Sequence, residues 1–222
     1  MMRSKSVAPR RFDDRQDAGR QLARDLLGLA GSPSLLVLGL PRGGVPVAAE
    51  IALSLGCALD VVLVRKVGVP GFVELAMGAV AAISGSLSTV RNGRVIAGLA
   101  GDGEATFRAA AARERIELGR QDALFRAGRP PVEVAGRTVV LVDDGVATGA
   151  TLRAAIGAVR PLHPAELIVA APVFLGQSLT HVQAVADRTV WLWDTPTLGS
   201  VGQAYRHFEP VPDDEVRRLL AA

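Results

Sequence analysis

Runs of adjacent apolar residues alternate along the chain with segments in which apolar residues recur at helical spacing. An apolar run without alternation is typical of a strand that is buried on both faces, as in a parallel sheet. Such runs stand at 35–38, 59–64, 139–142, 167–173 and 190–193. Helical stripes follow two of them, at Val47, Ile51 and Leu55 and at Leu152, Ala155, Ile156 and Val159. This alternation predicts an α/β fold built on a parallel sheet.

Other segments carry simpler patterns. The stretch 12–31 opens with acids and has one apolar helical face, which predicts a helix whose arginines form a solvated surface. The Asn92-Gly93 pair between short β-like runs predicts a hairpin turn. Alanine and charged residues dominate 104–125, which predicts a long helix, with one or two of its arginines able to reach a substrate phosphate. Residues 1–12 resemble a flexible basic lead to a single domain, 13–222.

Composition narrows the class of protein. A chain of 222 residues with 49% hydrophobic content suits one domain with a large core. The net charge is +3 and nearly all cations are arginines, so the pI of about 9.7 does not indicate a concentrated nucleic-acid face. The single cysteine, Cys57, cannot form an internal disulfide, and the sequence has neither a transmembrane run nor a signal peptide. We therefore expect a soluble cytoplasmic protein without nucleic-acid or membrane partners.

The stretch 139–152, VVLVDDGVATGATL, carries the strongest chemical signal. Its strand runs into Asp143 and Asp144, and a turn of small and hydroxylated residues then opens a helix. Unpaired N–H groups at a helix start bind anions, so the residues from Ala147 to Thr151 can hold a phosphate. The two carboxylates would repel that phosphate, and they suit a sugar diol or Mg²⁺ instead. A ribose 5-phosphate fits both halves of the stretch.

Two plainer interpretations compete with phosphate binding. A Walker B strand also ends in acids, but no G-x-x-x-x-G-K-[ST] sequence occurs in the chain. A βα loop with an N-cap threonine remains as the other interpretation. The stretch resembles the 5-phosphoribosyl-1-pyrophosphate (PRPP) binding motif of type I phosphoribosyltransferases. That resemblance implies a Rossmann-like parallel-sheet core at about 35–175, with a small hood from the chain ends at about 13–33 and 176–222.

The segment between the first apolar run and its helix contains Pro41, Arg42, Gly43 and Gly44. Paired glycines allow the backbone to wrap an anion, and an arginine can grip phosphate oxygens in a bidentate manner. Gly-Gly turns are common, so this signal is weak alone. Beside the PRPP motif it resembles the family's pyrophosphate loop, which often has a non-proline cis peptide, here expected near Pro41-Arg42.

The second apolar run delivers Arg65 and Lys66 at its end. Two cations there can neutralise a pyrophosphate leaving group, or they can simply cap an exposed strand end. The adenine-type enzymes of the same family have a similar Arg-Lys pair that leads into a mobile catalytic loop. Gly68, Pro70 and Gly71 suit such a loop.

The C-terminal tail supplies candidates for the acceptor site. In type I enzymes the hood binds the base, often by stacking it on an aromatic ring. The candidates are Trp191, Trp193, Tyr205 and Phe208, with Asp194 as an acceptor for the edge of the base. The alternative is that these rings form a small core under the hood. Hypoxanthine-guanine enzymes have an aspartate where this chain has Ala147, which disfavours a 6-oxopurine.

The resemblance implies a reaction in which an acceptor displaces pyrophosphate from C1 of PRPP. Asp143 and Asp144 would hold the ribose diol, directly or through Mg²⁺ as cofactor, and residues 147–151 the 5-phosphate. Arg42, Gly43, Gly44, Arg65 and Lys66 would stabilise the pyrophosphate, under a loop closing from about residue 67. The expected partners are PRPP and a small acceptor base, and a homodimer stays open. The alternatives are a non-catalytic PRPP sensor, a PRPP synthase, which needs two related halves, and an enzyme acting on another ribose phosphate.

Overall fold

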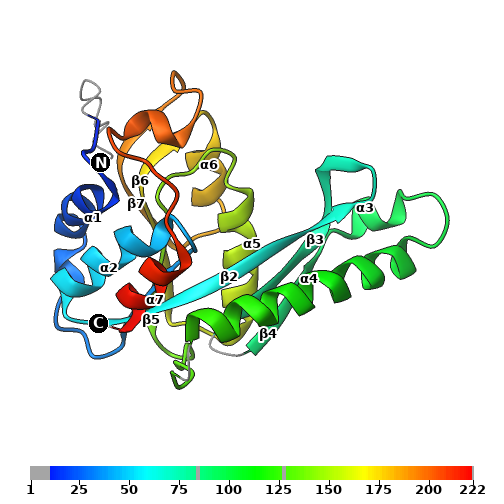
Figure 1. The fold of residues 1–222 in the computed structure, drawn as a ribbon, viewed down its shortest axis with the longest axis horizontal. Coiled ribbons are helices and arrows are strands. Elements are labelled where there is room, and N and C mark those ends of the chain that lie inside the picture. Colours follow the sequence, from blue (N-terminus) through cyan, green and yellow to red (C-terminus); the bar gives the residue numbers. More distant parts are fainter. Residues whose placement is uncertain (1–10, 84–85, 127–128, 222) are drawn as a thin grey trace.

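A seven-stranded sheet runs through the computed structural model, which describes residues 11–83, 86–126 and 129–221 (Figure 1). Its strand order is β4-β3-β2-β1-β5-β6-β7. The five strands from β2 to β7 in this order are parallel, whereas β3 and β4 are antiparallel additions at one edge. The bounds are β1 Leu35–Gly39, β2 Ala58–Val69, β3 Phe72–Ile83, β4 Ser86–Arg91, β5 Thr138–Val142, β6 Glu166–Leu175 and β7 Arg188–Thr195. This arrangement confirms the α/β fold predicted from the apolar runs.

Helices cover both faces of the parallel strands because successive strand residues send side chains to opposite sides. Leu36 and Leu38 pack toward α5 (Ala150–Val159), and Leu35 and Val37 pack toward the other face. That second face is covered by α1 (Arg15–Arg24) and α2 (Gly44–Leu55). The short helix α6 (Ser178–Gln183) lies against β6 and β7. Single 3-10 turns occur at Leu27–Leu29, Arg160–Leu162 and Val201–Ala204.

An arm formed by β2, β3 and β4 extends from the core to one side (Figure 1). The long helix α4 (Gly103–Arg126) lies along it, with the short helix α3 (Gly93–Ala97) near the far end. α4 buries Phe107, Leu118 and Phe125 in a cluster shared with β2 and β3. The prediction of a long helix at 104–125 is thus confirmed.

Two local predictions in the arm were wrong. Asn92 and Gly93 do not form a hairpin turn, because the Asn92 side chain accepts a hydrogen bond from the Val95 N–H and caps α3. An Asn-Gly pair suits a helix start as well as a hairpin. The strand predicted to end near residue 64 continues as β2 to Val69, because antiparallel pairing with β3 satisfies its backbone. A β-hairpin therefore occupies the place of the predicted loop.

The N-terminal segment pairs with the C-terminal tail where Phe12 meets Tyr205. Phe12 is buried and its backbone bridges to Tyr205, so it does not belong to a flexible lead; residues 1–10 of that predicted lead lie outside the described residues. The last helix, α7 (Asp213–Ala221), leaves the predicted hood and buries Val216 and Leu220 against α4. Among the described residues, no helix is both long and apolar enough to cross a membrane.

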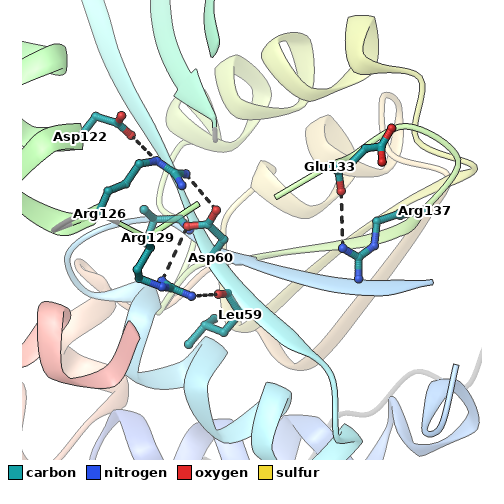
Figure 2. A network of polar contacts seen from close by, with 8 residues as sticks. Leu59, Asp60, Asp122, Arg126, Arg129, Glu133 and Arg137 are labelled. Atoms are coloured by element: carbon teal, nitrogen blue, oxygen red, sulfur yellow. Dashed lines mark hydrogen bonds and ion pairs between the residues drawn. The ribbon is translucent and has the colours of Figure 1, made fainter. Parts of the chain in front are cut away.

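A buried ion-pair network fastens the C-terminal end of α4 to β2 (Figure 2). Asp60 on β2 is 1% exposed and accepts a hydrogen bond from Nη2 of Arg126 at 2.9 Å. Arg126 also donates from Nε to Asp122 at 3.0 Å, while Arg129 reaches the carbonyl of Leu59 at 2.9 Å. A buried carboxylate is costly without a cation, so these arginines fix where α4 ends on the sheet.

Candidate functional site

The PRPP-like loop and the Gly-Gly loop lie side by side at the carboxyl edge of the sheet. β1 and β5 are paired neighbours, so the segments that follow them leave the sheet together. A Cβ atom added to Gly43 would collide with Oδ2 of Asp144, and one added to Gly44 would lie 2.5 Å from the Val142 carbonyl oxygen. Both glycines are therefore required by close backbone approach, which the sequence alone could suggest but not demonstrate.

Each of the two adjacent acids has one oxygen held by the protein. The Asp144 N–H donates to Oδ1 of Asp143 at 2.9 Å, and Nε of Arg15 donates to Oδ2 of Asp144 at 2.8 Å. Within the described ranges, the second oxygen of each carboxylate has no hydrogen-bond partner. Two carboxylate oxygens thus stay available as acceptors, which is the number of acceptors that a vicinal diol requires.

The environment of these acids opposes their ionisation. Burial and the neighbouring Asp144 charge raise the pKa of Asp143 well above its ordinary value. Burial also raises the pKa of Asp144, against the opposing effect of the Arg15 guanidinium. Two carboxylates in one enclosed site favour a ligand that supplies hydrogen-bond donors or positive charge.

The turn that follows Asp143 and Asp144 is hydrogen-bonded to β6 and α6, and most of its residues are exposed to solvent. Val146 bridges to Phe174, and the Ser178 hydroxyl donates to the Val146 carbonyl at 2.9 Å. Gly149 has a left-handed backbone with φ of 74°, and Arg153 N–H donates to its carbonyl as α5 begins. Ala147, Thr148, Ala150 and Thr151 are exposed. The first turn of α5 therefore begins beside the two acids, as an anion site requires, and the Ala150 N–H there donates to the Thr148 hydroxyl oxygen at 3.3 Å.

Arg65 and Lys66, two of the residues predicted to bind pyrophosphate, lie on opposite faces of β2. The Pro41-Arg42 peptide is cis, as the resemblance implied, and Nη1 of Arg42 lies 3.5 Å from Oδ1 of Asp213. Arg65 pairs through Nε with Glu114 of α4 at 2.5 Å. Lys66, the next residue, is directed to the opposite face, because its strand neighbours alternate between the two cores. The prediction that Arg65 and Lys66 stand at a strand end was wrong, because β2 continues to Val69. Their role in binding pyrophosphate stays a prediction.

A separate cavity lies on each of these two faces of β2. One of about 380 Å³ lies between the Gly-Gly loop, β2, α4 and α7, and Arg42, Arg65 and Arg120 line it together with Asp213. Arg120 is the α4 arginine that reaches this group, and it pairs with Glu117 at 2.7 Å. The other cavity, of about 460 Å³, lies between the arm and α5, and its polar lining includes Lys66, Thr151 and Arg153. Guanidinium groups thus gather on the side of the predicted pyrophosphate loop, whereas Lys66 faces the phosphate turn.

The hood aromatics are largely engaged in packing. Tyr205 is 3% exposed, and its hydroxyl donates to the Asp144 carbonyl at 2.5 Å. Burial and the nearby Asp144 charge raise the pKa of Tyr205 well above its ordinary value, so the hydroxyl stays protonated. Phe208 stacks on Tyr205 with ring centroids 4.9 Å apart. Trp191 and Trp193 are half-buried, and Asp194 is exposed. Tyr205 therefore belongs to the small core that the sequence left as the alternative to base stacking.

Arg15 is the site residue that the sequence analysis missed. We expected the arginines of the first helix to be solvated, yet the Arg15 side chain is 11% exposed. Besides Asp144, its Nη1 donates to the Glu209 carbonyl at 2.9 Å, and its guanidinium carbon lies 3.8 Å from the centre of the Phe208 ring. No spacing pattern marks such a residue, because its partners are more than one hundred positions away in the chain.

The acids suit magnesium only together with a ligand. Among the residues that the structure describes, no group of three or more His, Cys, Asp or Glu side chains could hold a metal ion. Asp143 and Asp144 leave two oxygens, and Mg²⁺ characteristically uses one or two carboxylates together with substrate phosphates and water. The donor set therefore fits a Mg²⁺ ion that shares its ligands with a phosphorylated substrate.

Known proteins resemble this chain in sequence and fold. Residues 12–197 match the family model of the phosphoribosyl transferase domain. The crystal structure of TT1426 from Thermus thermophilus has 41% identity and a TM-score of 0.84, covering 95% of this chain and 98% of that chain. "Putative phosphoribosyl transferase MT0597" and "Putative phosphoribosyl transferase Rv0571c", from two Mycobacterium tuberculosis strains, are each 44% identical over 209 residues. The match covers 94% of this chain but 46% of each relative, so the chain spans about half their length. This chain belongs to the phosphoribosyl transferase domain family.

Proposed function

We propose that the protein transfers the 5-phosphoribosyl group of PRPP to a nitrogenous acceptor and releases pyrophosphate in a Mg²⁺-dependent reaction. The observation that carries this proposal is the placement of two partly engaged carboxylates between a helix-start phosphate turn and the arginine-lined cavity. A molecule that satisfies all three has a diol flanked by a phosphate on one side and a second anionic group on the other. PRPP has this order of groups.

The diol and the 5-phosphate would hold the sugar in place. Oδ2 of Asp143 and Oδ1 of Asp144 accept hydrogen bonds from the two ribose hydroxyls. The N–H groups and hydroxyls of residues 147–151 bind the 5-phosphate, and Lys66 adds positive charge from its cavity at Thr151. These contacts are remote from C1, so their binding energy orients the reacting carbon.

The other side of the site would stabilise the leaving group. The C1–O bond breaks with its electron pair leaving on pyrophosphate, while the acceptor nitrogen's lone pair forms the C1–N bond. An acceptor that carried a proton on that nitrogen loses it to solvent or to the departing pyrophosphate. Arg42, Arg65, Arg120 and the Gly43 N–H offset the growing negative charge, whereas the Gly44 N–H already donates to the Leu40 carbonyl. Mg²⁺, when bound, supplies further neutralisation of the pyrophosphate oxygens.

The hairpin tip replaces the predicted closing loop. β2 and β3 are joined at Pro70 and Gly71, where Gly71 has φ of 81°. Phe72 beside this turn is 64% exposed. A role in closure would require this tip, which stands at the end of the arm away from the core (Figure 1), to move toward bound PRPP, where it would exclude water and protect the substrate from hydrolysis.

One residue narrows the choice of acceptor base. Ala147 has no carboxylate with which to handle the proton of a 6-oxopurine, so a 6-oxopurine is disfavoured, and adenine-like, orotate-like and unusual acceptors stay open. The test is pyrophosphate release from PRPP and Mg²⁺ across purines, pyrimidines, orotate and nicotinate-like acids. Release that depends on one acceptor would support a transferase and name its substrate class. Mg²⁺-dependent PRPP binding without release for any acceptor would support a non-catalytic PRPP sensor instead.

A further inference from the structure

Asp144 is fixed from three sides. Its Oδ2 receives the hydrogen bond from Nε of Arg15, and the same oxygen lies where a side chain on Gly43 would begin. Its backbone carbonyl receives the Tyr205 hydroxyl. Only Oδ1 is left for a ligand, so the position of Asp144 determines where one of the two diol acceptors points.

Arg15 is itself held by the hood. Its Nη1 is bound to the Glu209 carbonyl, and its guanidinium rests on Phe208, which stacks on Tyr205. These contacts form a closed circuit that begins and ends at Asp144, because the Tyr205 hydroxyl donates a hydrogen bond to the Asp144 carbonyl. A guanidinium is suited to this task because its planar donors can bind a carboxylate and a carbonyl simultaneously while one face covers an aromatic ring.

Asp144 also needs a cation for electrostatic reasons. It lies beside Asp143 in an enclosed site, where two carboxylates disfavour each other. Of the contacts described for Asp144, Arg15 supplies the only ion pair. Without it, the carboxylate would lose both its counter-charge and the contact that sets its orientation.

We propose that Arg15 is a positioning residue that orients Asp144 for recognition of the ribose diol and links this acid to the hood. The proposal rests on the proposed function, because it assigns a ribose diol to the two acids. It predicts that the contribution of Arg15 is confined to ligands that carry both hydroxyls. A residue with a merely structural role would affect all phosphorylated sugars equally.

The test compares ribose 5-phosphate with 2-deoxyribose 5-phosphate, in titrations followed by ligand-observed NMR in the presence of Mg²⁺. The wild type is expected to prefer the ribose form. Arg15→Gln should weaken binding of ribose 5-phosphate by roughly tenfold, as for loss of a charge-assisted hydrogen bond, and leave binding of the 2-deoxy sugar within about twofold. Arg15→Lys, which keeps the charge, should regain part of the preference. It also serves as the second variant if Arg15→Gln does not fold by circular dichroism.

Arg20→Gln is the matched control, because Arg20 lies on the same helix, is 51% exposed and pairs with Glu50 away from the acids. This variant should keep the wild-type preference. Equal weakening of both sugars by Arg15→Gln, an unchanged preference, or tighter ribose binding would each overturn the proposal. A wild type that binds neither PRPP nor ribose 5-phosphate would overturn the proposed function itself. Binding of PRPP with an unchanged preference in Arg15→Gln would overturn only the role of Arg15.

Discussion

Arg65 and Lys66 are consecutive in the chain but serve opposite faces of β2. Arg65 meets Glu114 and the cavity lined by Arg42 and Arg120, whereas Lys66 lines the cavity beside Thr151. Adjacent residues in a strand cannot approach one small anion from the same side. We therefore propose separate roles for the two cations, which their order in the sequence conceals.

This separation predicts different losses in two single variants. Arg65→Gln should weaken binding of pyrophosphate by roughly tenfold, because it removes one guanidinium from that cavity. Lys66→Gln should instead weaken binding of ribose 5-phosphate and leave pyrophosphate binding nearly unchanged. Isothermal calorimetry with each ligand and Mg²⁺ measures both effects. Equal losses of pyrophosphate affinity in the two variants would show that the cations act together after all.

Gly43 offers a steric test of the contact between the two loops. A methyl group there would overlap Oδ2 of Asp144 so closely that one of the two must move. Gly43→Ala should therefore displace Asp144 and reduce PRPP binding by more than tenfold, a loss of over about 1.4 kcal/mol. Gly28→Ala is the control, since nothing lies within 4 Å of its added Cβ. Wild-type affinity in Gly43→Ala would mean that the loops separate at little cost.

The raised pKa of Asp143 makes a prediction about stability and pH. The folded state holds its proton to a higher pH than the unfolded state does, so ionisation of Asp143 destabilises the fold as pH rises through the raised pKa. Asp143→Asn cannot ionise and can still accept the hydrogen bond from the Asp144 N–H. Its melting temperature should exceed that of the wild type at about pH 8, and the difference should shrink toward about pH 4. Calorimetric melts at both pH values measure the difference in melting temperature between the variant and the wild type. A difference that grows on acidification would contradict the prediction.

The buried network at Asp60 should matter more than an exposed ion pair. Asp60→Ala leaves Arg126 enclosed with one acid fewer, and we expect it to lower the free energy of unfolding by about 3 kcal/mol. Asp187→Ala removes an ion pair with Arg160 whose side chains are 41% and 39% exposed, and the pair itself should contribute about 1 kcal/mol or less. Urea unfolding of both variants gives the comparison. Similar losses would indicate that the buried network is not the stronger anchor.

Local patterns predicted the parts of this molecule that depend on local physics. The apolar runs around Val37, Val140 and Val169 identify buried parallel strands, because burial on both faces imposes an unbroken apolar sequence. The loop at Asp143 and Asp144 could be located for a similar reason. Strand end, glycine-containing turn and helix start follow one another in the chain, and that order favours anion binding.

Long-range contacts account for what the sequence did not reveal. The continuation of β2 beyond Val64 depends on pairing with β3, and the packing of α7 depends on the exposed flank of α4. Arg15 resembles its solvated neighbour Arg20 in type and helical setting, and only the tertiary fold brings it to Asp144. A charged residue at a distant site gives no periodic signal, so single-sequence reasoning assigns it to the surface.

The central claim is that Asp143 and Asp144 bind the ribose of PRPP. Its most direct test is calorimetric titration of PRPP with Mg²⁺ into the wild type and into the double variant Asp143→Asn, Asp144→Asn. The account predicts saturable binding by the wild type and its loss in a double variant that remains folded, because neutral amides cannot replace the two carboxylate acceptors. Wild-type affinity in the folded double variant would contradict the assignment of these acids.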